Sequence, residues 1–299
     1  MNKVYRSVLV LLAGAALALP AVPPLRAAEL ERTGGPYVPT PQVVVDQMLR
    51  MAGVGPSDFV IDLGSGDGVI VLTAAKEFKA RGFGVDIDPE LVKLSNNEAK
   101  RLGLADRVAF QVQDVFKADL SRATVLTLYL LPSMMSNLQA KVYNELKPGT
   151  RVVSHDYHFG DWPADDDITF DVPEKEKING VPRATIYLWI VPARVAGKWR
   201  LRIDGAAGGN YDLDIKQKFQ VFEGSALAGG RSTKLDLPGL RGEAIRFALT
   251  AGAGRHVFSG RVSGDTMQGT VELATGKGAA RWTASRITTQ ATVRELTRN

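Results

Sequence analysis

The stretch VIDLGSGDGVIVLTAAK, residues 60–76, decides the fold of this chain. Its apolar beginning predicts a buried β-strand that Asp62 closes, and the apolar periodicity after the glycines predicts an amphipathic helix. Gly64, Gly66 and Gly68 alternate through the turn between them, where the lack of Cβ atoms lets a ligand approach the backbone. A strand, a glycine turn and a helix N-terminus together present backbone N–H groups, so we expect a ligand to bind at this turn.

The glycine spacing separates two classes of nucleotide-binding fold. A dinucleotide-binding turn has the pattern G-x-G-x-x-G, whereas here the spacing is G-x-G-x-G and Val69 follows the last glycine. With an acidic residue two positions upstream, the turn resembles that of class I S-adenosylmethionine (SAM) methyltransferases. The resemblance implies SAM as the cofactor.

Strands and helices alternate on both sides of this stretch, which predicts a parallel sheet with crossover helices. The expected strands are residues 58–63, 82–87, 107–113, 123–130, 150–156, 167–172 and 183–192. The expected helices are one beginning at Pro41 with Thr40 as its N-cap, then residues 68–80, 89–102 and 132–146. The last two strands have no strong helix between them and are expected to form an antiparallel hairpin. The predicted fold class is α/β, a Rossmann-like seven-stranded methyltransferase sheet over residues 36–194.

The pattern changes after about Arg194 to short alternating segments broken by glycines. These predict a smaller all-β antiparallel domain over residues 198–290, a meander that forms a small sandwich or an open barrel. The expected strands are residues 199–203, 211–222, 244–250, 256–262, 266–273 and 280–287.

The first residues have the composition of a targeting segment. Lys3 and Arg6 precede an apolar run, and small residues near Ala28 offer a cleavage site, which together predict a secretory signal peptide over residues 1–28. An uncleaved membrane anchor is the alternative, although the run is short and Pro20 interrupts it. The chain has no Cys, which excludes a lipoprotein anchor. We therefore expect an exported protein of the periplasm.

The charges of the two halves differ in sign. Residues 28–194 carry 18 basic and 23 acidic side chains, whereas residues 195–299 carry 16 basic and 9 acidic ones. The opposite signs could favour docking between the two halves. Alternatively, the basic C-terminal half could contact an anionic membrane surface or an envelope polymer. Scattered solvated charge is the simpler alternative, because the basic residues form no single run.

Three acidic residues follow three successive predicted strands. Asp62 can orient the turn or the ammonium of the methionine part of SAM, Asp86 is placed to accept two hydrogen bonds from the ribose, and Asp114 is placed for the adenine amino group. Any one of them alone is equally well a turn residue or a helix cap. The predicted cofactor residues from the strands and turn are therefore Asp62, Gly64, Ser65, Gly66, Gly68, Asp86 and Asp114.

A closer family resemblance rests on three segments. Tyr37-Val38-Pro39-Thr40, then DLGSGDG at 62–68 and LLP at 130–132, resemble the lysine methyltransferases of the ATP synthase c subunit and the adenine nucleotide translocase, with their bacterial relatives. The resemblance covers about residues 36–160. It implies that the upstream segment folds over the cofactor, which adds Tyr37 and Thr40 as cofactor residues. A rigid entry loop with a helix cap is the alternative for these two residues.

The methyl acceptor is expected near the ends of the fourth and fifth strands. Tyr129 is a candidate acceptor contact, with a buried strand residue as the alternative. His155 and Asp156 are candidates for a general base or a substrate contact, with an ordinary polar loop as the alternative. Two histidines lie in this segment, but no third ligand is evident, so no metal site is predicted.

The predicted function is SAM-dependent methyl transfer to a protein lysine. The residues after Tyr129 replace the Asn/Asp-Pro-Pro-Tyr signature of enzymes that methylate the amino groups of nucleic acids, so no nucleic-acid substrate is expected. Methyl transfer to a small molecule is one alternative. An exported, non-catalytic binding protein is another, favoured by the signal peptide because SAM is made in the cytosol.

Overall fold

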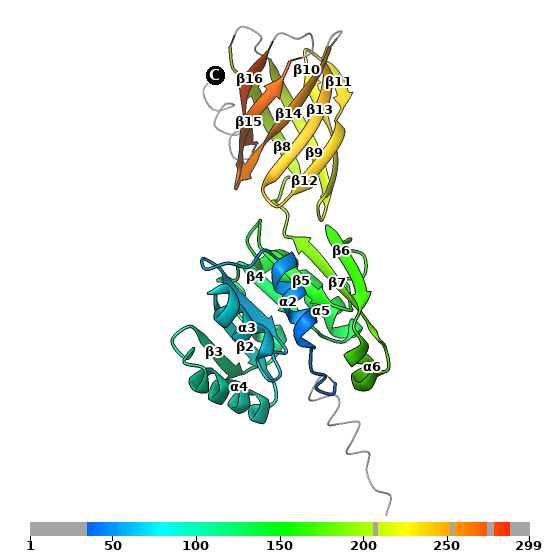
Figure 1. The fold of residues 1–299 in the computed structure, drawn as a ribbon. Coiled ribbons are helices and arrows are strands. Elements are labelled where there is room, and N and C mark those ends of the chain that lie inside the picture. Colours follow the sequence, from blue (N-terminus) through cyan, green and yellow to red (C-terminus); the bar gives the residue numbers. More distant parts are fainter. Residues whose placement is uncertain (1–34, 206–208, 252–253, 274–277, 288–299) are drawn as a thin grey trace, which may run out of the picture.

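Two β-sheets follow one another along the chain in the computed structural model, which describes residues 35–205, 209–251, 254–273 and 278–287 (Figure 1). The expected signal peptide at residues 1–28 and the last residues of the expected second domain, 288–290, lie outside the described residues. Within these ranges, no helix is long and apolar enough to cross a bilayer.

The first sheet has seven strands, and all pairs among its first five strands are parallel. Across the sheet the order is β3 (Val108–Val112), β2 (Arg81–Asp86), β1 (Phe59–Leu63), β4 (Val125–Leu128), β5 (Arg151–His155), β7 (Arg183–Ile190) and β6 (Asp166–Asp171). β7 runs antiparallel to both of its neighbours. The methyltransferase sheet expected from the sequence, with its terminal antiparallel hairpin, is therefore confirmed.

Helices cover both faces of this sheet. They are α2 (Gln42–Met51), α3 (Val69–Phe78), α4 (Pro89–Arg101), α5 (Pro132–Glu145), the short α6 (Pro173–Asn179) and the single 3-10 turn η1 (Val115–Lys117). The alternation of β1 explains the layers: Val60 packs in a cluster with α2 and α3, whereas Ile61 and Leu63 pack with α5 on the other face. α4 joins the α3 side through a cluster that includes Val92.

Two local expectations about helices were wrong. α2 begins at Gln42, and Pro41 is its N-cap residue with φ −57° and ψ 144°, so Thr40 lies before the helix and gives it no side-chain cap. The proline that was expected to open the helix instead stays extended. The second error is α6, a helix of seven residues between β6 and β7 where no strong helix was expected.

The second sheet has nine antiparallel strands, where six were expected. Their order is β11 (Arg231–Lys234), β10 (Val221–Ala228), β9 (Asn210–Lys218), β8 (Gly197–Ile203), β16 (Ala279–Arg286), β15 (Thr266–Glu272), β14 (Gly254–Ser263), β13 (Ala244–Ala251) and β12 (Asp236–Arg241). The expected strand 211–222 is two strands, because the chain reverses at Phe219, which has a positive φ of 54°. The two ends of the sheet approach one another, since β10 contacts β12, and the buried side chains of this near-barrel include Trp199 and Trp282.

The near-barrel contacts the first domain at the amino ends of the parallel strands. The Phe219 ring stacks on Trp162, with centroids 5.2 Å apart and planes 9° apart, and lies edge-on to Tyr143 near the end of α5. The indole N–H of Trp162 also donates to Gln220 at 2.9 Å. In Figure 1 the near-barrel and α6 accordingly lie at opposite ends of the first domain. The second domain therefore leaves the carboxyl edge of the parallel strands uncovered.

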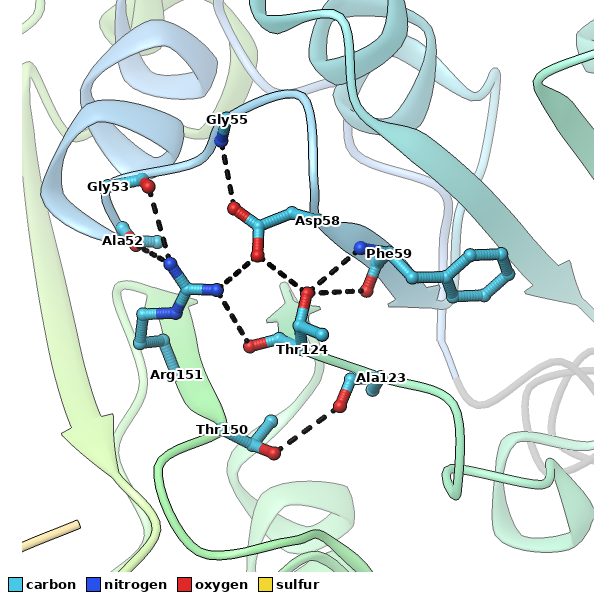
Figure 2. Close-up of polar contacts among 9 residues, drawn as sticks. All are labelled: Ala52, Gly53, Gly55, Asp58, Phe59, Ala123, Thr124, Thr150 and Arg151. Atoms are coloured by element: carbon cyan, nitrogen blue, oxygen red, sulfur yellow. Dashed lines mark hydrogen bonds and ion pairs between the residues drawn. The ribbon is translucent and has the colours of Figure 1, made fainter. Parts of the chain in front are cut away.

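A polar network joins the starts of three strands at the same amino edge (Figure 2). The buried carboxylate of Asp58 accepts hydrogen bonds from the Gly55 amide, the Thr124 hydroxyl and the Arg151 guanidinium. Arg151 also donates to the carbonyls that follow α2, so the network joins α2, β1, β4 and β5. Burial alone would raise the pKa of Asp58, but these hydrogen bonds and the charge of Arg151 hold it below its ordinary value.

Replacing Asp58 with Asn is expected to lower the free energy of unfolding by about 1–2 kcal/mol at pH 7, because Arg151 loses its charged partner. A carboxyl group whose pKa is lower in the folded state stabilises the fold at pH values above its unfolded pKa of about 4. This contribution to stability is lost as the pH falls through the pKa of the folded state. The difference between wild type and variant should therefore shrink below pH 4. Urea unfolding at several pH values measures it. The exposed Asp106→Asn is the control, and an equal loss in that variant would contradict the account.

Candidate active site

A cleft of about 720 Å³ opens at the carboxyl ends of the parallel strands. The segment before α2, the glycine turn after β1, and the residues that follow β2, β3 and β4 contribute to its walls. Of the predicted site residues, those that line it are Tyr37, Thr40, Asp62, Gly64, Ser65, Gly66, Asp86, Asp114 and Tyr129. The cleft thus brings together residues from positions 37 to 129 at the place where ligands bind in open α/β sheets.

The turn needs glycine for two physical reasons. Gly64, Gly66 and Gly68 all have positive φ, between 53° and 81°, where other residues are strained. A Cβ on Gly66 would lie 2.6 Å from the Tyr37 ring, and one on Gly68 would lie 2.7 Å from the Phe110 ring. Gly68 does not line the cleft, so its contribution is to the packing beneath the turn.

The amides of the turn are largely bonded within the protein, which corrects the expectation of several free N–H groups. Gly64 and Ser65 both donate to the Val85 carbonyl at 2.9 Å, and Gly68 donates to the Ser65 carbonyl at 2.8 Å. Gly66 donates to a carboxylate oxygen of Asp86 at 2.8 Å. Ligand contacts at this turn therefore depend more on close approach and on the acidic side chains than on open amides.

Asp62 is buried beneath the turn. Its carboxyl accepts a hydrogen bond of 2.6 Å from the buried Thr127 hydroxyl. Burial raises the pKa of Asp62 to about 7; the hydrogen bond from Thr127 opposes the rise, and the nearby charges of Asp86 and Asp67 add to it. The group can therefore change its charge near neutral pH when a cationic ligand arrives.

Asp86 and Asp114 lie half-buried at the ends of β2 and β3. Besides the Gly66 amide, Asp86 accepts the amide of Asp88 at 3.0 Å, so its carboxylate is held in one orientation. Asp114 accepts the Phe116 amide at 2.9 Å as the N-cap of η1. Each of these two acids therefore acts as a turn residue or a helix cap, which was the alternative to ligand binding, and each also lines the cleft.

The segment before α2 lies over the turn. Tyr37 is 45% exposed, and its hydroxyl donates a hydrogen bond to the carboxylate of Asp67, the residue after Gly66. Burial, Asp67 and Asp86 together raise the Tyr37 pKa, so its hydroxyl stays protonated. Thr40 lines the cleft as well, although it caps no helix.

Tyr129 lines the cleft, but His155 and Asp156 do not. His155 is fully buried, and its ring lies 4.0 Å from that of Tyr129, centroid to centroid. Asp156, with a positive φ of 63°, pairs with the ammonium of Lys175 from α6. The expectation that His155 or Asp156 acts as a general base or contacts the acceptor therefore has no support in the geometry, because neither residue lines the cleft.

Sequence reasoning missed Lys175 and Tyr157. Tyr157 lines the cleft beside Tyr129, with ring centroids 6.3 Å apart and planes 17° apart. The position of Tyr157, two residues after the candidate His155, could have identified it as a site residue. Lys175 lies among other charged residues that read as a solvated surface, and no local pattern predicts its burial. Among the described residues, no group of three or more potential ligands is placed to hold a metal ion.

The cleft fits the three parts of SAM. One buried polar atom that lines it, the Ser65 hydroxyl, has no hydrogen-bond partner within the described residues. The carboxylates of Asp62, Asp86 and Asp114 are acceptors, which suits an ammonium, a ribose diol and an adenine amino group.

Comparisons with known proteins show the family of this chain. Residues 62–166 match the model of the ANTKMT methyltransferase domain. A protein-lysine N-methyltransferase of Saccharolobus islandicus (strain REY15A) is 38% identical over 157 residues, which cover 52% of this chain and 93% of that protein. This chain belongs to the same methyltransferase family.

Other matches extend the comparison. The lysine N-methyltransferase of the ATP synthase c subunit from Xenopus laevis is 36% identical to this methyltransferase, over 51% of this chain and 67% of that protein. A solved structure, an RNA methyltransferase from Salinibacter ruber in complex with S-adenosyl-L-homocysteine, is 47% identical over 53% of this chain and 96% of that chain, with a TM-score of 0.48. By its family membership, and not by this structural likeness, the chain is a SAM-dependent methyltransferase. The near-barrel lies outside the residues that match the family model.

The pKa of Asp62 gives a prediction about SAM binding. A SAM ammonium is attracted by ionised Asp62 and not by its neutral form, so SAM affinity should rise about tenfold from pH 5.5 to pH 7. The affinity should rise with pH, and not fall, because acid protonates the Asp62 carboxylate and so removes the negative charge that attracts the ammonium. Asp62→Asn should bind SAM more weakly and lose the rise. Calorimetric titration with SAM at several pH values measures both, and an equal slope in the two proteins would contradict the role of Asp62.

Proposed function

We propose that this methyltransferase transfers the methyl group of SAM to the Nε of a lysine on a protein. The relatives that support the proposal are named as lysine N-methyltransferases. They include the adenine nucleotide translocase lysine N-methyltransferase of Mus musculus, 34% identical over 42% of this chain and 55% of that protein. The observation that carries it is the pair of tyrosine rings, Tyr129 and Tyr157, on the wall of the cleft. Aromatic faces attract ammonium groups such as that of a lysine side chain.

When bound, SAM supplies a methyl group already activated by its sulfonium, so the protein has mainly to align the acceptor and exclude water. The acceptor ammonium must first lose a proton to water, because only the lone pair of the neutral amine can form the new bond to carbon. Burial raises the pKa of Tyr129 to about 12, with smaller contributions from Asp156 and Tyr157. Tyr129 therefore remains a neutral phenol that can hydrogen-bond the acceptor nitrogen and orient it.

The roles of the site residues form part of the proposal. Asp86 would accept the ribose hydroxyls, Asp114 the adenine amino group and Asp62 the methionine ammonium. The glycine turn with Ser65 would carry the cofactor, and Tyr37 and Thr40 would cover it. Tyr129 would touch the acceptor. Their common position on the walls of the cleft supports these assignments.

A methyl-transfer assay tests the proposed acceptor. Wild-type protein and Asp86→Ala are incubated with methyl-labelled SAM and an envelope extract, and the labelled material is divided into protein, RNA and dialysable small molecules. We expect protein-bound label that appears as methyl-lysine on hydrolysis and is absent with the variant. Label in RNA or in small molecules would contradict the protein acceptor. SAM binding without any transfer would favour a non-catalytic binding protein.

We also propose that residues 1–28 are a signal peptide that sends the protein to the periplasm. The support is the sequence pattern of basic residues, an apolar run and small residues. Residues 1–30 fused to a reporter that is active only outside the cytosol should give activity, and a fusion with Lys3 and Arg6 replaced by Glu should lose it. An inactive parent fusion would contradict export.

We propose further that residues 36–194 form the catalytic domain, and that residues 198–290 form a separate domain that contacts an anionic surface of the envelope. The excess of basic residues after position 195 supports the contact, and the near-barrel lies away from the cleft. The protein should sediment with vesicles that contain anionic lipid and not with purely zwitterionic vesicles, and less so at high salt. Equal sedimentation with both kinds of vesicle would contradict the contact.

A further inference from the structure

A buried group of charged and polar side chains lies behind the acceptor end of the cleft. The Lys175 side chain is 1% exposed, and its ammonium pairs with the Asp156 carboxylate and lies 3.1 Å from Nε2 of the fully buried His155. The second oxygen of Asp156 accepts the Thr185 amide of β7 at 3.1 Å. Burying a lysine ion pair is costly, and an apolar side chain would serve simple packing at least as well. The pair therefore calls for a role beyond packing.

Two contacts connect this group to Tyr129. The His155 ring packs on the Tyr129 ring at 4.0 Å, with 32° between the planes. Asn179, four residues after Lys175 and therefore on the same side of α6, hydrogen-bonds the Tyr129 side chain. α6 thus contacts Tyr129 in two ways. Asn179 of α6 contacts it directly, and Lys175 of α6 contacts His155, whose ring packs on Tyr129.

We propose that Lys175 is a positioning residue for methyl transfer, which with Asp156 fixes α6 and His155 against Tyr129 and so sets where the Tyr129 hydroxyl meets the acceptor. The inference rests on the proposed function, because it assigns a role at the acceptor end of that site. Lys175 itself does not line the cleft, so it acts only through its neighbours.

The charges around His155 give a signature that packing alone would not produce. The groups that face it are Tyr129 after β4, Asp156 after β5 and Lys175 from α6. Burial lowers the pKa of His155 to about 4; Asp156 opposes the shift, and Lys175 adds to it. Removing the Lys175 charge should therefore raise this pKa.

The test compares Lys175→Met with Lys177→Met, an exposed lysine on the same helix. Methyl-labelled SAM and the envelope extract give initial rates at increasing extract concentration, and calorimetry gives the SAM affinity. We expect Lys175→Met to reduce transfer about tenfold to a hundredfold with SAM affinity unchanged, since small misplacement of a reacting group has effects of this size. Lys177→Met should behave as wild type.

Two further variants separate positioning from a general loss of folding. Lys175→Met combined with Asp156→Asn removes both charges, and it should restore stability but not the rate. Lys175→Met combined with Tyr129→Phe should be no slower than Tyr129→Phe alone, because both changes act through one hydroxyl. The chain has three His, so the His155 NMR resonance can be assigned by substitution, and its pKa should rise in Lys175→Met.

The outcomes are distinct. Wild-type rates in Lys175→Met, or a parallel loss of SAM affinity, would overturn the positioning role while leaving the proposed function standing. An unchanged His155 titration would likewise overturn it. If the wild-type protein itself puts no label on protein lysine, the proposed function fails first.

Discussion

SAM binding is expected to weaken about a hundredfold when Asp86 is replaced with alanine. The carboxylate lines the cleft and accepts the backbone amides of Gly66 and Asp88, so its removal takes away the proposed ribose contact and also frees the glycine turn. Hydrogen bonds to a charged group contribute about 1.5–3 kcal/mol, and the upper part of that range corresponds to a hundredfold change in affinity. Calorimetric titration with SAM measures the effect.

Two controls divide this effect into its parts. Asp86→Asn keeps an oxygen for the Gly66 amide but loses the charge, so its affinity should fall between those of wild type and Asp86→Ala. Asp88→Ala removes an equal charge two residues further on, where the residue also lines the cleft but its side chain caps α4 by accepting the Glu90 amide. It should change SAM affinity only a few-fold. Wild-type affinity in Asp86→Ala would show that the ribose lies elsewhere.

Replacing Gly68 with alanine is expected to lower the free energy of unfolding by roughly 3 kcal/mol. At a φ of 81° any Cβ is strained, by about 1–2 kcal/mol. The added carbon would also lie 2.7 Å from Phe110 and 2.9 Å from Ser95, and overpacking of this kind costs about 1–3 kcal/mol. Urea unfolding of the protein without SAM measures the loss.

Gly103 provides a matched control for this prediction. Its φ of 68° is similar, but a Cβ there would meet nothing within 4 Å. Gly103→Ala should therefore show the backbone strain alone, and the difference between the two variants isolates the clash with Phe110 and Ser95. Equal destabilisation by both substitutions would contradict the packing role of Gly68.

The meeting of the glycine turn and the acidic residues on one cleft was predictable because its signals are local in the sequence. The glycine turn lies within seven residues of Asp62, and Asp86 and Asp114 stand at the ends of the next two strands, where strand order alone brings them together. What the sequence could not show is how the turn uses its amides. Bonds such as that from Gly66 to Asp86 span 20 residues and depend on the register of β1 and β2.

The acceptor side was less predictable because its contacts are tertiary. Lys175 lies in a short charged segment that reads as surface, and only the packing of α6 against β5 and β7 buries it. The split of residues 211–222 was missed because the reversing residue, Phe219, is neither glycine nor asparagine. Its ring packs on Trp162, so contact between domains, and not local preference, accounts for this turn.

A crystal structure of the protein with S-adenosyl-L-homocysteine would test the central claim most directly. We predict the ribose hydroxyls against Asp86, the adenine beside Asp114, the amino-acid end towards Asp62 and the sulfur facing Tyr129. Density for the ligand outside this cleft, or a ribose without contact to the Asp86 carboxylate, would contradict the account.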